Sequence, residues 1–258
     1  MASANLPVIQ PAGLGQTDRK DAWWAGPLAT AITLGVFGLY LTARALMNSN
    51  YHVESEALLS PLYSPLIIIP GMPAWLSPAF LILWAPGGFR ATCYYYRKAY
   101  YRAFFMDPPA CAVGEPAHRG QNYKGETSFP FILQNIHRYF MYAALVFNII
   151  LLYDAYLAFF PGGHFAVTVG SLVITLNAVL LLSYTLSCHS LRHLVGGKLD
   201  CFSCSAPNKV RHTGWKQLTK LNENHMAIAW TSLVGVAATD LYVWLVASGH
   251  LTNVHLFG

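Results

Sequence analysis

Long apolar segments are the strongest constraint on the fold of this chain. Each of five segments is long enough to cross the hydrocarbon core of a bilayer, which is about 30 Å thick. They cover residues 27–47, 74–96, 131–160, 164–193 and 225–249. Only 10% of the residues are charged, against about 25% in soluble domains. The pattern predicts an all-α membrane protein, a bundle of about five transmembrane helices, although Pro78 and Pro86-Gly87-Gly88 interrupt the second segment.

The positive charges are distributed unevenly between the loops. Of the sixteen Lys and Arg residues, only Arg44 falls on the side of the bundle opposite to all the others. Because cytoplasmic loops are enriched in Lys and Arg, we expect a cytoplasmic N-terminus, an outer C-terminus and a multi-pass protein of the plasma (inner) membrane. No nucleic-acid-binding motif is present, and a basic face beside a membrane explains the net charge.

The same pattern divides the chain. Residues 1–26 form a cytoplasmic N-terminal segment without the apolar core of a cleavable signal peptide. Residues 27–258 form a single transmembrane helical domain, with cytoplasmic loops at residues 97–130 and 194–224.

Candidate metal ligands lie at the end of the fourth apolar segment and just after it. His189 and His193 are spaced to share one helix face, and Gly196-Gly197 can end that helix and let Cys201 and Cys204 fold back. Two imidazoles and two thiolates suit zinc or a His2Cys2 iron–sulfur cluster. All five cysteines fall at or near the cytoplasmic side, where thiols normally stay reduced. We therefore expect a metal site near that side and no disulfide.

Three other residues leave the ligand set open. Cys188 could replace one thiolate, and His137 or His225 could replace one imidazole. His137 begins the third segment and His225 the fifth, both near the cytoplasmic side, so this pair could instead hold a b-type haem. A structural zinc site in a non-redox membrane scaffold is a further alternative. The histidines could also bind no metal and only bond lipid headgroups.

No catalytic residue is indicated, but two further groups could serve a redox site. Asp154 and Asp240 lie within apolar segments, where ionisable groups usually face a polar cavity or a partner. They could transfer protons or simply link neighbouring helices. Arg138, Trp215 and Trp230 lie near the cytoplasmic boundary and could border a quinone headgroup.

The chain resembles the single-chain membrane anchor of actinobacterial succinate dehydrogenase, the enzyme also called respiratory complex II. The resemblance rests on Ser60-Pro-Leu-Tyr-Ser-Pro65, the tract Tyr94–Phe105, Asn135-Ile-His-Arg-Tyr-Phe140 and the region Cys188–Cys204. It implies a complex with a flavoprotein subunit and an iron–sulfur subunit, in which electrons from succinate reach menaquinone or ubiquinone at the anchor. This chain would then be a non-flavin subunit of the enzyme.

The resemblance also implies a cofactor. Many such anchors hold b-type haem, but this chain lacks histidine pairs at both membrane depths. It looks more like the class whose anchor holds a Rieske-type [2Fe–2S] cluster, with His189, His193, Cys201 and Cys204 as the implied ligands.

Overall fold

The protein is mostly helical. The computed structural model describes residues 20–73, 76–104, 131–197 and 199–258. Four described helices are long and apolar enough to cross a membrane: α1 (Ala25–Met47), α5 (His137–Leu157), α6 (Val169–Leu186) and α9 (His225–Ala247). The shorter helices are α2 (Pro78–Ile82), α3 (Trp84–Ala91), α4 (Tyr94–Phe104), α7 (His189–Gly196) and α8 (Ala206–Glu223). The predicted all-α membrane architecture is confirmed.

Short elements complete the described chain. Three 3-10 helices are η1 (Glu54–Glu56), η2 (Phe131–Ile136) and η3 (Pro161–Gly163). The strands β1 (His52–Val53) and β2 (Leu58–Leu59) pair antiparallel, as do β3 (Val167–Thr168) and β4 (His255–Phe257). Residues 1–19 of the predicted N-terminal segment and residues 105–130 of the first predicted loop lie outside the described residues. The second predicted loop, residues 194–224, contains α8.

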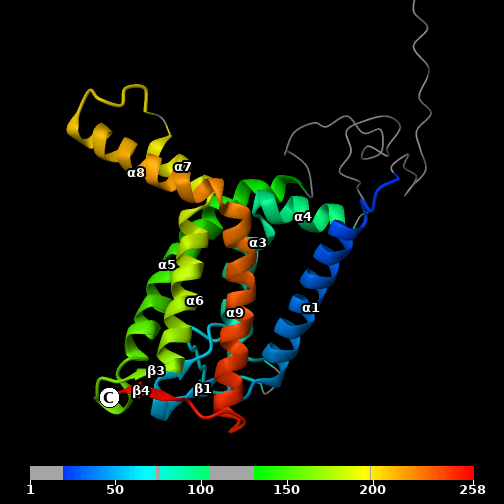
Figure 1. Cartoon of the computed structure of the whole chain (residues 1–258), viewed down its shortest axis with the longest axis vertical. Coiled ribbons are helices and arrows are strands. Elements are labelled where there is room, and N and C mark those ends of the chain that lie inside the picture. The colour runs from blue at the N-terminus through cyan, green and yellow to red at the C-terminus, as the bar shows by residue number, and fades with distance from the viewer. Residues whose placement is uncertain (1–19, 74–75, 105–130, 198) are drawn as a thin grey trace, which may run out of the picture. The chain divides into compact units, whose positions relative to one another are not determined.

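Two compact units divide the chain: residues 1–39 with 91–134, and residues 40–90 with 135–258. In the second unit α5, α6 and α9 stand side by side, with α6 packed against both others (Figure 1). Their shared core is made of Leu58, Leu151, Ala155, Ala158, Ile174, Ala178 and Val243. The alanines allow close helix approach, as small residues do in membrane bundles. We call the end where α5 and α9 begin the basic end, and the other the opposite end.

The predicted second span, residues 74–96, does not form one straight helix. Pro78 stands in the first turn of α2, where Ser77 accepts a hydrogen bond from Ala79 N at 3.3 Å. Pro86 stands in the first turn of α3. Proline is tolerated in a first turn because the N–H it lacks has no partner there. The two prolines therefore begin short helices, and Pro78 to Ala91 reaches only roughly 20 Å at ~1.5 Å per residue.

These short helices nevertheless return the chain toward the basic end. Ser60 contacts Asp240 on α9, whereas Arg90 contacts the Ala229 carbonyl on the same helix. These positions on α9 are about 16 Å apart along its axis at ~1.5 Å per residue. The segment between Ser60 and Arg90 thus advances about 16 Å along α9 toward the basic end. This supports a second crossing that is broken into short helices.

A buried ion pair lies toward the opposite end. Arg44 Nε donates to Asp240 Oδ2 at 2.7 Å, and the two residues are 4% and 0% exposed. Tyr40 and Ser60 donate to the same carboxylate. Charged groups within a membrane are expensive unless they are paired and hydrogen-bonded. These contacts favour a helix-linking role for Asp240, and they place Arg44 at the end predicted for it.

The loop from Ser60 to Pro65 binds both aspartates of the apolar segments. Ser60 donates to Asp240, and Ser64, which is buried, donates to Asp154 on α5. Between them, the Tyr63 hydroxyl donates to the Arg44 carbonyl at 2.8 Å. One loop therefore connects α1, α5 and α9 through its side chains.

Replacing Asp240 with Ala is expected to lower the free energy of unfolding by about 3–5 kcal/mol, because Arg44 would stay buried without its counter-ion. Thermal unfolding of the purified protein in detergent measures the loss. Glu223→Ala is the matched control, since Glu223 is exposed on α8.

The double variant Arg44→Met/Asp240→Leu should recover most of this stability, because an apolar pair needs no ionic partner. Equal unfolding temperatures for Asp240→Ala and Glu223→Ala would contradict a stabilising role for the pair.

Candidate functional site

A cluster of aromatic, cationic and sulfur-containing side chains lies at the basic end. Its members, which we call the helix-end cluster, are Phe89, Arg90, His137, Tyr184, Cys188 and His225. His137 and His225 are the first residues of α5 and α9, so both imidazoles lie at one end of the bundle, as the sequence predicts. Phe89, Tyr184 and Cys188 are at most 3% exposed, while Arg90, His137 and His225 are half-buried. The site thus has a buried interior and a partly exposed edge.

Aromatic contacts join the two histidines. The Phe89 ring stacks on His137 with centroids 4.9 Å apart, and Tyr184 stacks on His225 at 5.2 Å. Phe89 and Tyr184 meet edge to face at 5.3 Å, a favoured aromatic geometry. Phe89 and Tyr184 therefore link the two imidazoles in a continuous chain of ring contacts. The alternative of a b-type haem held by His137 and His225 stays a prediction.

Polar contacts orient the same side chains. His137 Nε2 lies 3.2 Å from Cys188 Sγ, and His225 Nδ1 lies 2.7 Å from Ser187 Oγ. Arg90 donates to Ser232 Oγ at 3.0 Å and places its guanidinium 4.5 Å above the Tyr184 ring, within cation–π range. The cluster therefore offers one cation and two half-buried imidazoles in fixed positions.

A glycine directly before the cluster explains how α3 reaches this position. A Cβ atom on Gly88 would overlap the Phe140 ring of α5. Only glycine permits this close approach, which brings Phe89 against His137 one turn from Phe140. Phe89, Arg90 and Tyr184 were not predicted as site residues. The signal for Phe89 and Arg90 was the Gly87-Gly88 pair that precedes them.

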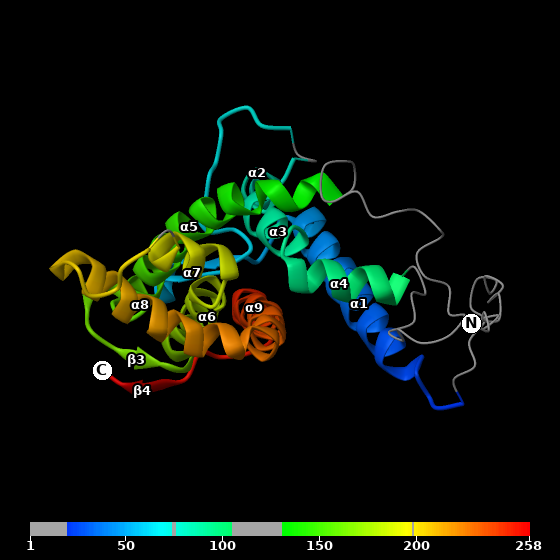
Figure 2. The ribbon, with the colours of Figure 1, turned by 90° about the horizontal axis from the view of Figure 1, so that it is seen from above.

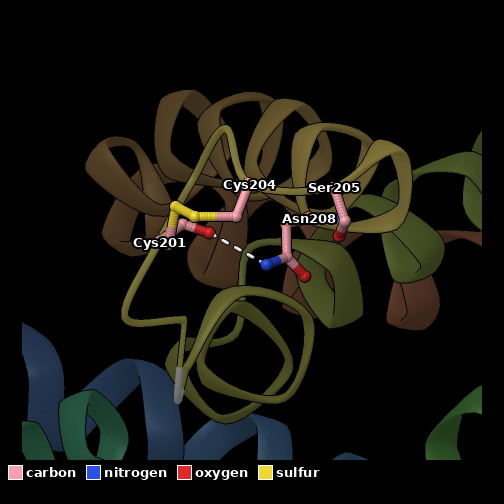
Figure 3. The surroundings of a disulfide bond; sticks show 4 residues. All are labelled: Cys201, Cys204, Ser205 and Asn208. Atoms are coloured by element: carbon pink, nitrogen blue, oxygen red, sulfur yellow. Dashed lines mark hydrogen bonds between the residues drawn. A yellow bond between two sulfur atoms is a disulfide. The ribbon is translucent and has the colours of Figure 1, made fainter.

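The predicted His2Cys2 site is not assembled. Cys201 and Cys204 are joined by a disulfide (Figure 3), so the prediction of no disulfide is wrong for this pair, and neither sulfur is a thiolate here. Their Cα atoms are 5.7 Å apart, within the usual range for a disulfide. Asn208 of α8 donates to the Cys201 carbonyl at 2.9 Å and Ser205 caps the helix, which holds the turn closed.

The two histidines of that predicted site line a pocket rather than a metal site with the two cysteines. His189 and His193 are exposed on α7 and line a pocket with α8. Within the described ranges, no group of three or more His, Cys, Asp or Glu side chains is arranged to hold a metal ion. The described residues therefore do not fit a Rieske-type cluster on His189, His193, Cys201 and Cys204.

The pocket between α7 and α8 has a volume of about 240 Å³. Its lining residues are His189, Arg192, His193, Gly196, Gly197, Leu199, Asp200, Phe202 and Trp215. Arg192 Nε donates to Thr219 at 2.9 Å, and its guanidinium lies 4.5 Å from the Trp215 ring centroid. These contacts tie the two helices together, which Figure 2 shows lying side by side.

The residues predicted to border a quinone are not gathered at one point. Trp215 lines the α7–α8 pocket, and the guanidinium of the exposed Arg138 lies 3.5 Å from His193 Nδ1. Trp230 is half-buried on α9 and does not line that pocket. Two of the three therefore lie near His193, and the third lies apart.

Comparisons with known proteins agree on one family. The sequence model described as actinobacterial succinate dehydrogenase subunit SdhC matches residues 25–249. A chain of the Mycobacterium smegmatis Sdh1 complex in the apo form is 44% identical, with a TM-score of 0.83. That match covers 96% of this chain and 97% of the other. No curated protein sequence matches significantly. The chain belongs to the SdhC family of actinobacterial succinate dehydrogenase subunits.

Proposed function

We propose that this chain forms the quinone-reducing side of succinate dehydrogenase and that quinone receives electrons at the helix-end cluster. As a family member, the chain is the membrane-anchor subunit of that enzyme. Its partners are the flavoprotein and iron–sulfur subunits, in a membrane that contains quinone. The observation that carries the proposal is the meeting of Arg90, His137 and His225, all half-buried, at one end of the bundle.

The chemistry of these side chains suits quinone reduction. A quinone that accepts two electrons also takes up two protons at its oxygens. Imidazoles can donate and accept protons near neutral pH, and the Arg90 guanidinium can stabilise negative charge that develops on the ring oxygens. Phe89 and Tyr184 hold the imidazoles in place by stacking. The two protons come ultimately from water, and the imidazoles can pass them on to the quinone oxygens.

The distribution of basic residues indicates how the chain is oriented in the membrane. The basic end, or the hairpin of α7 and α8 that extends from it, carries Arg90, Arg138, Arg192 and the lysines of α8. We propose that this end faces the cytoplasm and meets the iron–sulfur subunit there, with the N-terminus cytoplasmic and the C-terminus outside. The broken crossing between Ser60 and Arg90 supplies the odd number of passes that this topology requires.

Asp154 and Asp240 are poorly placed to protonate a quinone at this cluster. Asp154 lies seventeen residues after His137 on α5, which is about 25 Å at ~1.5 Å per residue. Asp240 accepts hydrogen bonds from Arg44, Tyr40 and Ser60, so its oxygens are already occupied within the bundle. The imidazoles of the helix-end cluster are the better placed groups for exchanging protons with a quinone there.

Replacing His225 with Ala is expected to lower quinone reduction by about 10²-fold, the usual loss when a general acid or base is removed. The intact complex should still reduce a soluble dye with succinate at the wild-type rate, because the dye accepts electrons upstream of this chain. The paired assay of succinate–quinone and succinate–dye activity measures both.

His164→Ala is the matched control, since His164 is exposed at the opposite end. Full retention of quinone reduction in both His225→Ala and His137→Ala would refute a role for the helix-end cluster.

An iron–sulfur relay enters the proposal only through the helix-end cluster. His137 and Cys188 provide an imidazole and a buried sulfur 3.2 Å apart, and His225 lies in the same cluster. A [2Fe–2S] cluster bound here would carry single electrons from the iron–sulfur subunit to quinone. The described residues supply no complete ligand set, so these side chains are assigned only their positions.

Cys188→Ser and Cys204→Ser separate the two possible locations. Any EPR signal and iron content beyond those of the iron–sulfur subunit should be lost with Cys188→Ser and kept with Cys204→Ser. EPR of the reduced complex, with iron analysis, measures both. Loss of the signal with Cys204→Ser would instead restore the ligand set that includes the CxxC pair.

A further inference from the structure

The α7–α8 pocket is separate from the helix-end cluster and lies just beyond a membrane-spanning helix. His189 follows the last residue of α6 by three positions and His193 by seven. At ~1.5 Å per residue, the pocket begins within about 10 Å of the end of the span. The headgroup layer on each side of a bilayer is roughly 5–8 Å thick. The pocket therefore opens at the level of the lipid headgroups.

The pocket presents hydrogen-bond donors around one fixed cation. The Nε atom of Arg192 is held by Thr219, and neither terminal nitrogen of Arg192 donates to an acceptor among the described residues. His189 and His193 add ring nitrogens from the same helix, and Arg138 lies beside His193. A guanidinium with two unused N–H edges matches the oxygens of a phosphate group.

Hydrogen bonds and close packing hold together the α7–α8 hairpin that carries these donors. Arg211 of α8 donates to the Val195 carbonyl at 2.9 Å and to the Gly197 carbonyl at 3.1 Å. It thereby satisfies the carbonyl groups at the end of α7, which have no partner within that helix. Gly196 packs directly against Trp215, where a Cβ atom would clash with the ring. These contacts hold the two walls of the pocket against each other.

We propose that the α7–α8 pocket binds the phosphate group of an anionic phospholipid headgroup. Lipid is the favoured source because of the surface around the pocket. Lys209, Lys216 and Lys220 are exposed along one face of α8, where they suit the negative surface of the cytoplasmic leaflet. Trp215 and Phe202 supply the aromatic rings typical of the membrane interface.

A quinone ring fits this pocket less well than a phosphate. Trp215, the aromatic ring best placed for stacking, is already covered by Arg192 at 4.5 Å and by His212 at 5.9 Å. The lining also includes Arg192, His189 and His193, whose side chains favour an anion over a neutral ring. Asp200 is the one acidic residue of the lining, and it is exposed.

Native mass spectrometry of the delipidated, intact complex tests the proposal. Phosphatidylglycerol is added in detergent, and phosphatidylcholine serves as the lipid without net charge. At one lipid concentration, wild type should carry one more phosphatidylglycerol molecule than Arg192→Gln. A lipid titration should give wild type an affinity about tenfold higher than that of the variant. Lys216→Gln removes one positive charge from α8 without touching the lining, and it should weaken binding much less than Arg192→Gln does. His193→Gln provides a second, exposed change that should weaken binding without loosening the hairpin.

Three results would overturn the assignment. Equal losses in Arg192→Gln and Lys216→Gln would reduce the effect to general surface charge. Displacement of the lipid by millimolar inorganic phosphate would make free phosphate the ligand. Displacement by a soluble quinone analogue would assign the pocket to quinone instead.

Discussion

The buried ion pair between Arg44 and Asp240 is the contact on which the rest of the bundle depends. Taking two charges out of water is costly, and the pair is stable only because Tyr40 and Ser60 complete the hydrogen bonds of the carboxylate. The pair joins the end of α1 to α9 and recruits the loop that also binds Asp154. It thereby fixes the position of α9 along the end of α1. His225 lies fifteen residues earlier on the same helix, so its level at the basic end follows from the position of Asp240.

The two ends of the bundle use polar groups differently. Toward the opposite end, the charged groups of the ion pair are almost completely buried and satisfy one another. At the basic end, Arg90, His137 and His225 are held by aromatic rings and short polar contacts but remain half-buried. An electron-accepting ligand needs donors that are fixed in position and still accessible. Only the second arrangement meets both conditions.

The sequence was most informative about features that depend on one property of a continuous segment, such as its hydrophobicity or its charge. Apolar length predicted α1, α5, α6 and α9, and the charge distribution identified Arg44 as the exceptional cation. Helix starts at His137 and His225 predicted two imidazoles at one end. The second span was predicted less well, because prolines that interrupt an apolar run can also begin new helices. Residues brought together by packing could not be predicted in the same way. Tyr184 lies far along the chain from Phe89 and Arg90, and no local pattern indicates that their side chains meet.

The α7–α8 hairpin shows why ligand counting is weak evidence near a membrane surface. Histidine, arginine and tryptophan gather at the headgroup level for reasons that include lipid contact as well as metal or quinone binding. The HxxxH spacing correctly predicted that His189 and His193 share a helix, but it does not determine what lies opposite that helix. In the folded chain α8 fills that position with Trp215, and the CxxC turn is closed by its own disulfide and by Asn208. The spacing of these residues leaves several kinds of site open, and the directions of their side chains distinguish them. The two sulfurs are joined to each other, while the imidazoles line a pocket with Arg192. The same residue types suit the anion proposed between the helices, and the proposed quinone site lies instead at the histidines that begin the spans.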